Sequence, residues 1–291
     1  MYKLNTLPNG LETVFIPMRG TKTATVLVMV GTGSKYETKE LSGISHFLEH
    51  MFFKGTKQRR NAMILSSELD SLGAEFNAFT GKEYTGYWVK AEAGKLERAM
   101  DIVSDMLLNS KMSSAEINRE KGVIIEELNM YRDNPMFYIE DVFEECLYGD
   151  TPAGWDTIGT RENIIGFTRR QFTSYLKDQY APHNTFVCIA GGGSEAKALN
   201  WARKYFAAAG FSERGQKFRE KEPVEENQRA PQLKVSYKKT DQAHLSLGVR
   251  SYPYNHTDRM TAKLISIILG GSMSSRLFSR LRERGGLAYY V

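Results

Sequence analysis

Alternation of hydrophobic and polar positions predicts strands in the first part of the chain. Residues 1–17 read as two short strands around a PNG turn, because proline, asparagine and glycine favour tight turns. Residues 23–30 (TATVLVMV) and 185–190 are apolar runs rich in β-branched side chains, and they predict further strands. In residues 74–91, two aromatic-rich segments flank TGKE, a pattern that is typical of a β-hairpin.

Hydrophobic residues at helical spacing predict the other elements of this part. The first helix should follow an N-cap at Ser42, cover residues 44–53 and stop at Gly55. A longer helix should begin with a cap at residue 113 or 114 and end near residue 133, before Asn134-Pro135. The remaining helices are expected over residues 62–72, 95–109, 138–147, 168–180 and 194–208.

The composition changes after residue 211. Residues 212–229 are charged and almost free of aliphatic side chains, which is typical of an exposed linker. The pattern then predicts two strands, a helix and the start of a third strand, at residues 234–237, 243–249, 258–269 and 287–291. This order resembles the opening of the chain and indicates an internal duplication. We therefore expect a first domain over 1–211, a linker over 212–230 and an incomplete second domain over 231–291.

Charge and cysteine content exclude several classes of protein. The net charge is +5, but acidic and basic residues are interleaved, so we expect no nucleic-acid partner. Cys146 and Cys188 have no CxxC spacing, which excludes a disulfide framework and favours reduced thiols. The N-terminus has no signal-peptide pattern, and no apolar stretch reaches the ~18 residues that span a bilayer. We therefore expect a cytoplasmic protein without a membrane partner.

The segment SHFLEHM places His46, Glu49 and His50 on one face of the first helix, at positions i, i+3 and i+4. Two imidazoles at i and i+4 can bind one Zn²⁺, with the carboxylate beside its open coordination position. There Glu49 can take a proton from water that the metal activates and pass it to a leaving amine. The motif fixes only three positions, so a core helix that carries three polar residues is the alternative.

A third ligand separates these two interpretations, because a catalytic zinc site has three protein ligands and an open position. Glu120 and Glu127 flank Ile124 at i−4 and i+3, so both share the buried side of the long helix. Glu126 lies roughly 200° around the helix from Ile124 and should face solvent. We therefore predict Glu127 as the third ligand and Glu120 as an acidic neighbour that orients a histidine N–H. The alternative role of Glu127 is an ordinary salt bridge.

Four stretches of the chain carry a resemblance to a known family. They read GISHFLEHMFFKGT, AEFNAFTGKEYTGYW, REKGVIIEELNMYRDNP and GGSMSSRLFSRLRERGGLAYYV, and they span nearly the whole chain. The chain resembles the pitrilysin, insulinase and mitochondrial processing peptidase family (M16) of inverzincin zinc metallopeptidases. The resemblance implies an α+β fold of two homologous domains, each a mainly antiparallel sheet covered by helices, with the second domain truncated here.

The resemblance also implies the residues of a catalytic site. It matches the zinc ligands to His46, His50 and Glu127, the general base to Glu49, and the accompanying acidic residue to Glu120. Residues 1–211 would then be the catalytic, zinc-binding domain, and each chain would hold one Zn²⁺.

Four further residues match positions that contact substrate in this family. Asn77 and Ala78 match an edge strand to which the peptide adds as an extra strand, a mode that tolerates varied sequences. Arg282 and Tyr289 match a second-domain arginine and tyrosine that approach the scissile peptide, where the tyrosine stabilises the oxyanion. Without the resemblance, these two residues would read as an exposed helix arginine and a strand aromatic.

The sequence thus predicts a zinc-dependent metalloendopeptidase that hydrolyses peptide bonds in peptides or unfolded segments. The expected partners are that substrate and a second M16 chain, in a homodimer or heterodimer. The alternative is a non-catalytic scaffold, or a partner subunit of a processing peptidase-type complex. The complete HxxEH motif and the short GGSMSSRL segment favour a catalytic chain, whereas DTPAGWDTIGTREN departs from the usual loop of the family.

Overall fold

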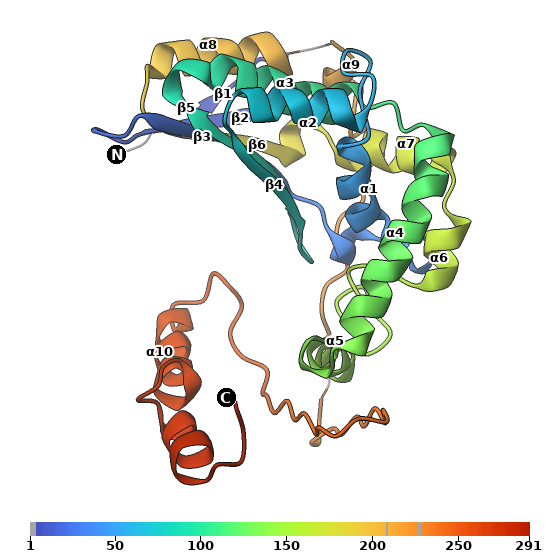
Figure 1. The fold of residues 1–291 in the computed structure, drawn as a ribbon, viewed down its shortest axis with the longest axis vertical. Coiled ribbons are helices and arrows are strands. Elements are labelled where there is room, and N and C mark those ends of the chain that lie inside the picture. The colour runs from blue at the N-terminus through green and yellow to red at the C-terminus, as the bar shows by residue number, and fades with distance from the viewer. Residues whose placement is uncertain (1–3, 208, 226–227) are drawn as a thin grey trace. The chain divides into compact units, whose positions relative to one another are not determined.

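The first part of the chain contains a mostly antiparallel sheet of six strands (Figure 1). The structure, a computed structural model, describes residues 4–207, 209–225 and 228–291. The strand order is β1-β2-β6-β3-β5-β4, and β2 pairs with β6 in parallel. The strands are β1 Leu4–Thr6, β2 Glu12–Pro17, β3 Thr23–Val30, β4 Glu75–Thr80, β5 Thr85–Glu92 and β6 Thr185–Gly191. The predicted N-terminal strand pair and the hairpin are confirmed by the β1–β2 and β4–β5 pairings.

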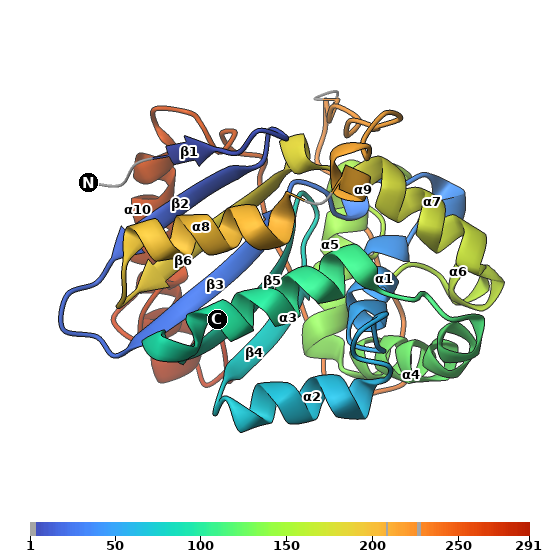
Figure 2. The same cartoon turned by 90° about the horizontal axis from the view of Figure 1, so that it is seen from above.

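Helices cover one face of this sheet, with α3 and α8 lying across the strands (Figure 2). Alternate strand residues such as Val26, Val89 and Ile189 are buried in the core, whereas Leu27 and Trp88, on the opposite face, stay partly exposed. The helices of this part are α1 Ile44–Phe52, α2 Ala62–Ser71, α3 Leu96–Asn109, α4 Ser114–Asp133, α5 Pro135–Tyr148, α6 Arg161–Gly166, α7 Arg169–Gln179, α8 Glu195–Phe206 and α9 Ala209–Ser212.

Helix α1 lies between the sheet and α4 and contacts both β4 and α4 (Figure 2). Its apolar side is anchored by aromatic contacts. Phe47 packs edge-on against Phe167 and Phe172, and Phe52 packs edge-on against Tyr87 of β5. These contacts fix the helix from one side and leave its polar side toward α4.

The start of α1 differs from the sequence prediction. Ser42 is not its cap; Gly43 is the N-cap residue, with a φ of 96°, and it has no side chain that could accept from the helix. Glycine is required there, because a Cβ would lie 2.2 Å from the carbonyl oxygen of Ile158. The carboxyl group of Glu37 instead accepts hydrogen bonds from N–H groups at the start of the helix.

One further helix boundary was predicted incompletely, and one helix was missed. Helix α5 begins at Pro135 rather than at residue 138, because Asn134 ends α4 and also caps α5, accepting from the Met136 N–H at 3.1 Å. The short helix α6 was not predicted, although Thr160 caps it by accepting from the N–H of Asn163.

The chain divides into two units, Met1–Leu245 and Ser246–Val291. The second unit contains α10 Arg259–Gly270, close to the predicted helix, and a π-helical segment, Phe278–Arg284. No described helix is both long and apolar enough to cross a membrane.

The strands predicted at 234–237, 243–249 and 287–291 are wrong, because no residue of these segments pairs with a strand of the described sheet. Their apolar side chains stay exposed, as Leu247 does at 91%. An alternating pattern needs a hydrogen-bonded neighbour and a covered face before it forms a strand. The α+β class, with a mainly antiparallel sheet covered by helices, is nevertheless confirmed.

Candidate metal centre

Two helices bring the three predicted metal ligands together. One nitrogen or oxygen atom from each of His46, His50 and Glu127 lies within 4.8 Å of the others. The Nε2 atoms of His46 and His50 are 3.6 and 3.3 Å from the two carboxylate oxygens of Glu127. The three side chains are 12, 22 and 24% exposed, so the group is shielded but reachable from solvent. No other group of three such side chains lies close enough together in the described chain.

The helical phase of α1 and α4 produces this convergence. His46 and His50 project from the same side of α1, and their ring centroids are 4.8 Å apart. On α4, Ile124 and Leu128 are buried while Glu126 is exposed, which is the orientation that the sequence predicts. Glu127 therefore turns toward α1, as the apolar stripe of α4 requires.

Glu120 contacts the site through His50. Its Oε1 lies 3.0 Å from the Nδ1 of His50, its Oε2 accepts from Lys54 Nζ at 2.6 Å, and the residue is buried. A histidine that donates through Nδ1 keeps the Nε2 lone pair free for a metal. The Nδ1 of His46 is buried and has no hydrogen-bond partner in the described chain. The His46 ring is instead held by the contact of its Nε2 with Glu127 and by edge-on packing against His50.

The carboxylates set the protonation of the group. Burial lowers the pKa of His50, but the hydrogen bonds with Glu120 and Glu127 outweigh it and raise the pKa to about 9. Hydrogen bonds from His46 and His50 hold the pKa of Glu127 well below its usual range. Burial acts to raise the pKa of Glu120, and the bonds with His50 and Lys54 reverse this effect. Two ionised carboxylates thus face the histidines and favour positive charge between them.

This donor set fits a zinc ion. Two imidazole nitrogens and one carboxylate oxygen are a known three-ligand set for catalytic zinc, which leaves a fourth position open. The three donors come from rigid helices, and their mutual distances allow one ion to contact all of them. The group can therefore bind a metal ion.

Glu49 directly precedes His50 on α1, and its side chain is hydrogen-bonded to a residue of the sheet. The hydroxyl of Thr80, the last residue of β4, donates a hydrogen bond to the Glu49 carboxylate. Sequence analysis missed Thr80, because the strand that carries it reaches α1 only through the folded sheet. The hairpin turn after Thr80 was a visible signal, but nothing in the sequence places that turn beside Glu49.

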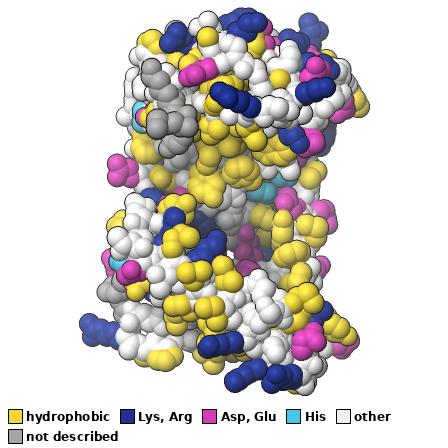
Figure 3. All heavy atoms as spheres, turned by 90° about the vertical axis from the view of Figure 1, so that its left-hand side faces the viewer, with side chains coloured by type: hydrophobic (Ala, Val, Ile, Leu, Met, Phe, Trp, Pro, Cys, Tyr) yellow, Lys and Arg dark blue, Asp and Glu magenta, His cyan; other side chains and the backbone are white. Residues whose placement is uncertain are grey.

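The predicted substrate residues Asn77 and Ala78 lie on β4, the edge strand of the sheet. Asn77 is exposed, and its side chain accepts from the N–H of Ala78 at 2.9 Å. Figure 3 shows hydrophobic side chains gathered on one face of the larger unit, in the upper half of the view, with histidine and acidic side chains near them.

Arg282 and Tyr289 belong to the second unit. The guanidinium of Arg282 lies over the ring of Phe278, 4.7 Å from its centroid. Tyr289 is 92% exposed and follows the π-helical segment without forming a strand. Their role at the metal centre stays a prediction.

Family models match the chain over nearly its whole length. Residues 13–161 match the model described as insulinase (peptidase family M16), and residues 166–291 match the model described as peptidase M16 inactive domain. The predicted domain limits at 211 and 231 coincide neither with this division nor with the two structural units, and they stay a prediction.

Curated relatives carry related names. The chain is 35% identical over 291 residues to the uncharacterized zinc protease YmxG of Bacillus subtilis, covering 100% of this chain and 69% of that protein. It is 35% identical over 286 residues to the uncharacterized zinc protease ML0855 of Mycobacterium leprae, covering 98% of this chain and 64% of the relative. The chain thus spans about two thirds of these relatives.

Solved structures support the fold. A protease from Helicobacter pylori superposes with a TM-score of 0.81 at 23% identity, over 100% of this chain and 70% of that one. A peptidase M16 inactive domain from Pseudomonas fluorescens superposes with a TM-score of 0.78 at 17% identity, over 100% of this chain and 69% of that one.

Proposed function

Because the chain belongs to the insulinase family of M16 peptidases, we propose that it is a zinc-dependent metalloendopeptidase. Its substrates would be peptides or unfolded segments of polypeptides. The observation that carries the proposal is the convergence of His46, His50 and Glu127, with Glu49 directly before His50 on the same helix.

These three ligands would hold one zinc ion per chain. When bound, zinc acts as a Lewis acid that polarises a carbonyl and lowers the pKa of water. Glu120 would keep the Nδ1 of His50 hydrogen-bonded, which would leave the Nε2 of His50 free to bind the ion.

Glu49 would transfer the proton in this reaction. Its carboxylate accepts a proton from the attacking water and then gives that proton to the amine that leaves the scissile bond. The Thr80 hydroxyl occupies the Oε2 of Glu49, which leaves Oε1 for the water and the amine. The position of the base is thereby set by both α1 and β4.

The substrate would add to the sheet as a strand along β4. Such binding uses main-chain hydrogen bonds, so an extended segment of varied sequence fits beside Asn77 and Ala78. From the second unit, Arg282 would approach the scissile peptide and the Tyr289 hydroxyl would donate to its oxyanion. These two contributions rest on the resemblance to the family.

The test is the substitution Glu49→Gln, which removes the proton acceptor and keeps the size of the side chain. We expect peptide hydrolysis to fall by roughly 10²–10⁴-fold while the bound zinc is retained. Glu126→Gln is the matched control, because that glutamate is exposed on α4, and it should leave both properties unchanged. Wild-type rates in Glu49→Gln with zinc bound would exclude this mechanism. A wild-type chain that takes up no zinc would instead favour the non-catalytic partner subunit.

A further inference from the structure

A buried carboxyl group lies at the start of the helix that carries both histidines. Glu37 is 0% exposed, and its two oxygens accept from the N–H groups of Gly43, at 2.7 Å, and Ser45, at 2.8 Å. Neither the metal contacts nor the proton transfer described above involves Glu37. Burying such a group is costly unless hydrogen bonds compensate for it, so this one needs a structural reason.

The start of α1 depends on this group for its hydrogen bonds. The first N–H groups of a helix have no partner within the helix, and Gly43 offers no side chain to satisfy them. Glu37 therefore replaces the missing cap, and it does so from a preceding loop rather than from the helix itself.

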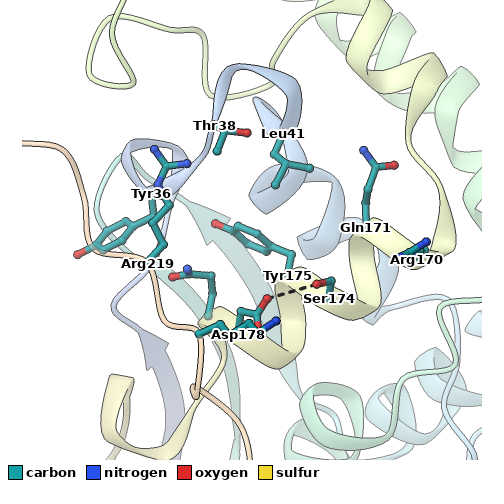
Figure 4. A pocket seen from close by; sticks show the side chains of 11 residues that line it. Tyr36, Thr38, Leu41, Arg170, Gln171, Ser174, Tyr175, Asp178 and Arg219 are labelled. Atoms are coloured by element: carbon teal, nitrogen blue, oxygen red, sulfur yellow. Dashed lines mark hydrogen bonds between the residues drawn. The ribbon is translucent and has the colours of Figure 1, made fainter.

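A second contact holds the same turn from α7. The hydroxyl of Ser45 lies 2.8 Å from that of Tyr175, which in turn lies 3.1 Å from the hydroxyl of Thr32. Thr32 also donates to the side chain of Gln179 at 3.3 Å. Tyr175 also lines a pocket of about 380 Å³, together with Leu41 and Tyr36 (Figure 4). The first turn of α1 is thus fixed through its backbone by Glu37 and through Ser45 by Tyr175.

This turn controls where the imidazoles point. His46 directly follows Ser45, and His50 lies one turn further along the same helix. Side-chain tips lie ~5–6 Å from a helix axis, so a 10° rotation moves each imidazole by about 1 Å. A binding site tolerates about 0.5 Å of such error. Glu127 is on a different helix and would not move with them.

We propose that Glu37 is a positioning residue for zinc: by binding the first-turn N–H groups of α1, it sets the rotation at which His46 and His50 face Glu127. The inference deepens the proposed function and rests on it, because it takes zinc as the ion at that site. Glu37 touches no ligand in this role and acts through the helix.

Zinc affinity, measured by competition with a chromophoric chelator, tests this role. Glu37→Met keeps most of the volume and removes both acceptors, and it should weaken zinc binding by about 10–100-fold, as loss of an orienting partner does. Glu37→Gln restores one acceptor and should recover part of the affinity. The same two variants should change the visible spectrum of bound Co²⁺, which reports ligand geometry.

Asn61→Ala is the matched control. Asn61 caps α2 by accepting from the N–H of Ile64 at 2.9 Å, and α2 carries no proposed ligand. Its loss should lower the midpoint of thermal unfolding and leave zinc affinity and the Co²⁺ spectrum unchanged.

Three results would overturn the inference: wild-type affinity in Glu37→Gln and any folded Glu37→Met, equal losses of affinity in Asn61→Ala, or an unaltered Co²⁺ spectrum in the Glu37 variants. A wild-type chain that binds no zinc is distinguishable from these, because it removes the proposed function itself and the inference with it. If Glu37→Met does not fold, Glu37→Gln alone decides between the outcomes.

Discussion

Glutamates of α4 that are close in sequence meet different environments, and their environments determine what each can do. Glu120 is buried and bonds to His50 and Lys54, whereas Glu126 is exposed. Because Glu120 orients a proposed ligand, Glu120→Gln should weaken zinc binding by about 10–100-fold. Glu126→Gln should leave it unchanged. Equilibrium dialysis against zinc measures both, and equal affinities would show that Glu120 has only a structural role.

Because Glu37 is buried, we expect the stability of the folded protein to depend on pH. Burial raises its pKa from 4.5 to about 8, against the opposing effect of the Ser45 and Gly43 N–H groups. The folded chain then holds this proton more tightly than the unfolded chain, so the free energy of unfolding should fall as pH rises from 4.5 through about 8. Urea unfolding of the metal-free protein over this range measures the effect. Glu37→Gln should lack this component, and parallel pH curves for the two proteins would contradict the prediction.

The sequence alone predicted that some of these residues lie close together, but it did not predict the contacts of others. His46, His50 and Glu127 follow from helical phase, because each helix carries an apolar stripe that fixes its orientation. Thr80 and Glu37 contact α1 across turns of the chain whose path no local pattern defines. Loop and strand-end residues of this kind become visible only when the elements are assembled.

At the scale of elements, the entry into α1 depends on a left-handed glycine. Gly43 has a φ of 96°, and a Cβ there would lie 2.2 Å from the Ile158 carbonyl oxygen. Gly43→Ala should therefore destabilise the protein by at least the ~1–3 kcal/mol that such backbone strain costs. Thermal unfolding measures this loss.

Gly122→Ala is the control for that substitution. Gly122 lies within α4 with nothing within 4 Å of an added Cβ, so alanine should stabilise the helix by about 1 kcal/mol. If Gly43→Ala melted at or above the wild-type temperature, the entry into α1 would not need glycine.

The elements show where sequence patterns stop being informative. The β4–β5 hairpin was predictable because its turn and its alternation agree, and each strand finds a neighbour. The segments at 234–237 and 243–249 have the alternation but no partner in the described sheet. Helix α6 is too short for a periodic pattern, so its capping residue was its only signal.

At the scale of the whole molecule, the proposed metal ligands and the proposed oxyanion donor belong to different units. A chain that ends at Leu245 keeps His46, His50 and Glu127 and should bind zinc as the full chain does. It lacks Tyr289, and loss of an oxyanion donor lowers kcat by roughly 10²–10³-fold. Zinc titration and a quenched-peptide assay on both chains measure this division. Equal hydrolysis by the two chains would exclude a contribution from the second unit.

The position of β6 in the sheet matters for the synthesis of the protein. This strand pairs with β2 on one side and with β3 on the other, although both strands lie far before it in the sequence. During synthesis, the sheet therefore stays in two parts until β6, which ends at Gly191, has left the ribosome. Glu127 leaves the ribosome well before that. Contacts so distant along the chain form slowly, and the unpaired edges of β2 and β3 are exposed meanwhile. The nascent chain thus holds every proposed zinc ligand before its sheet is complete.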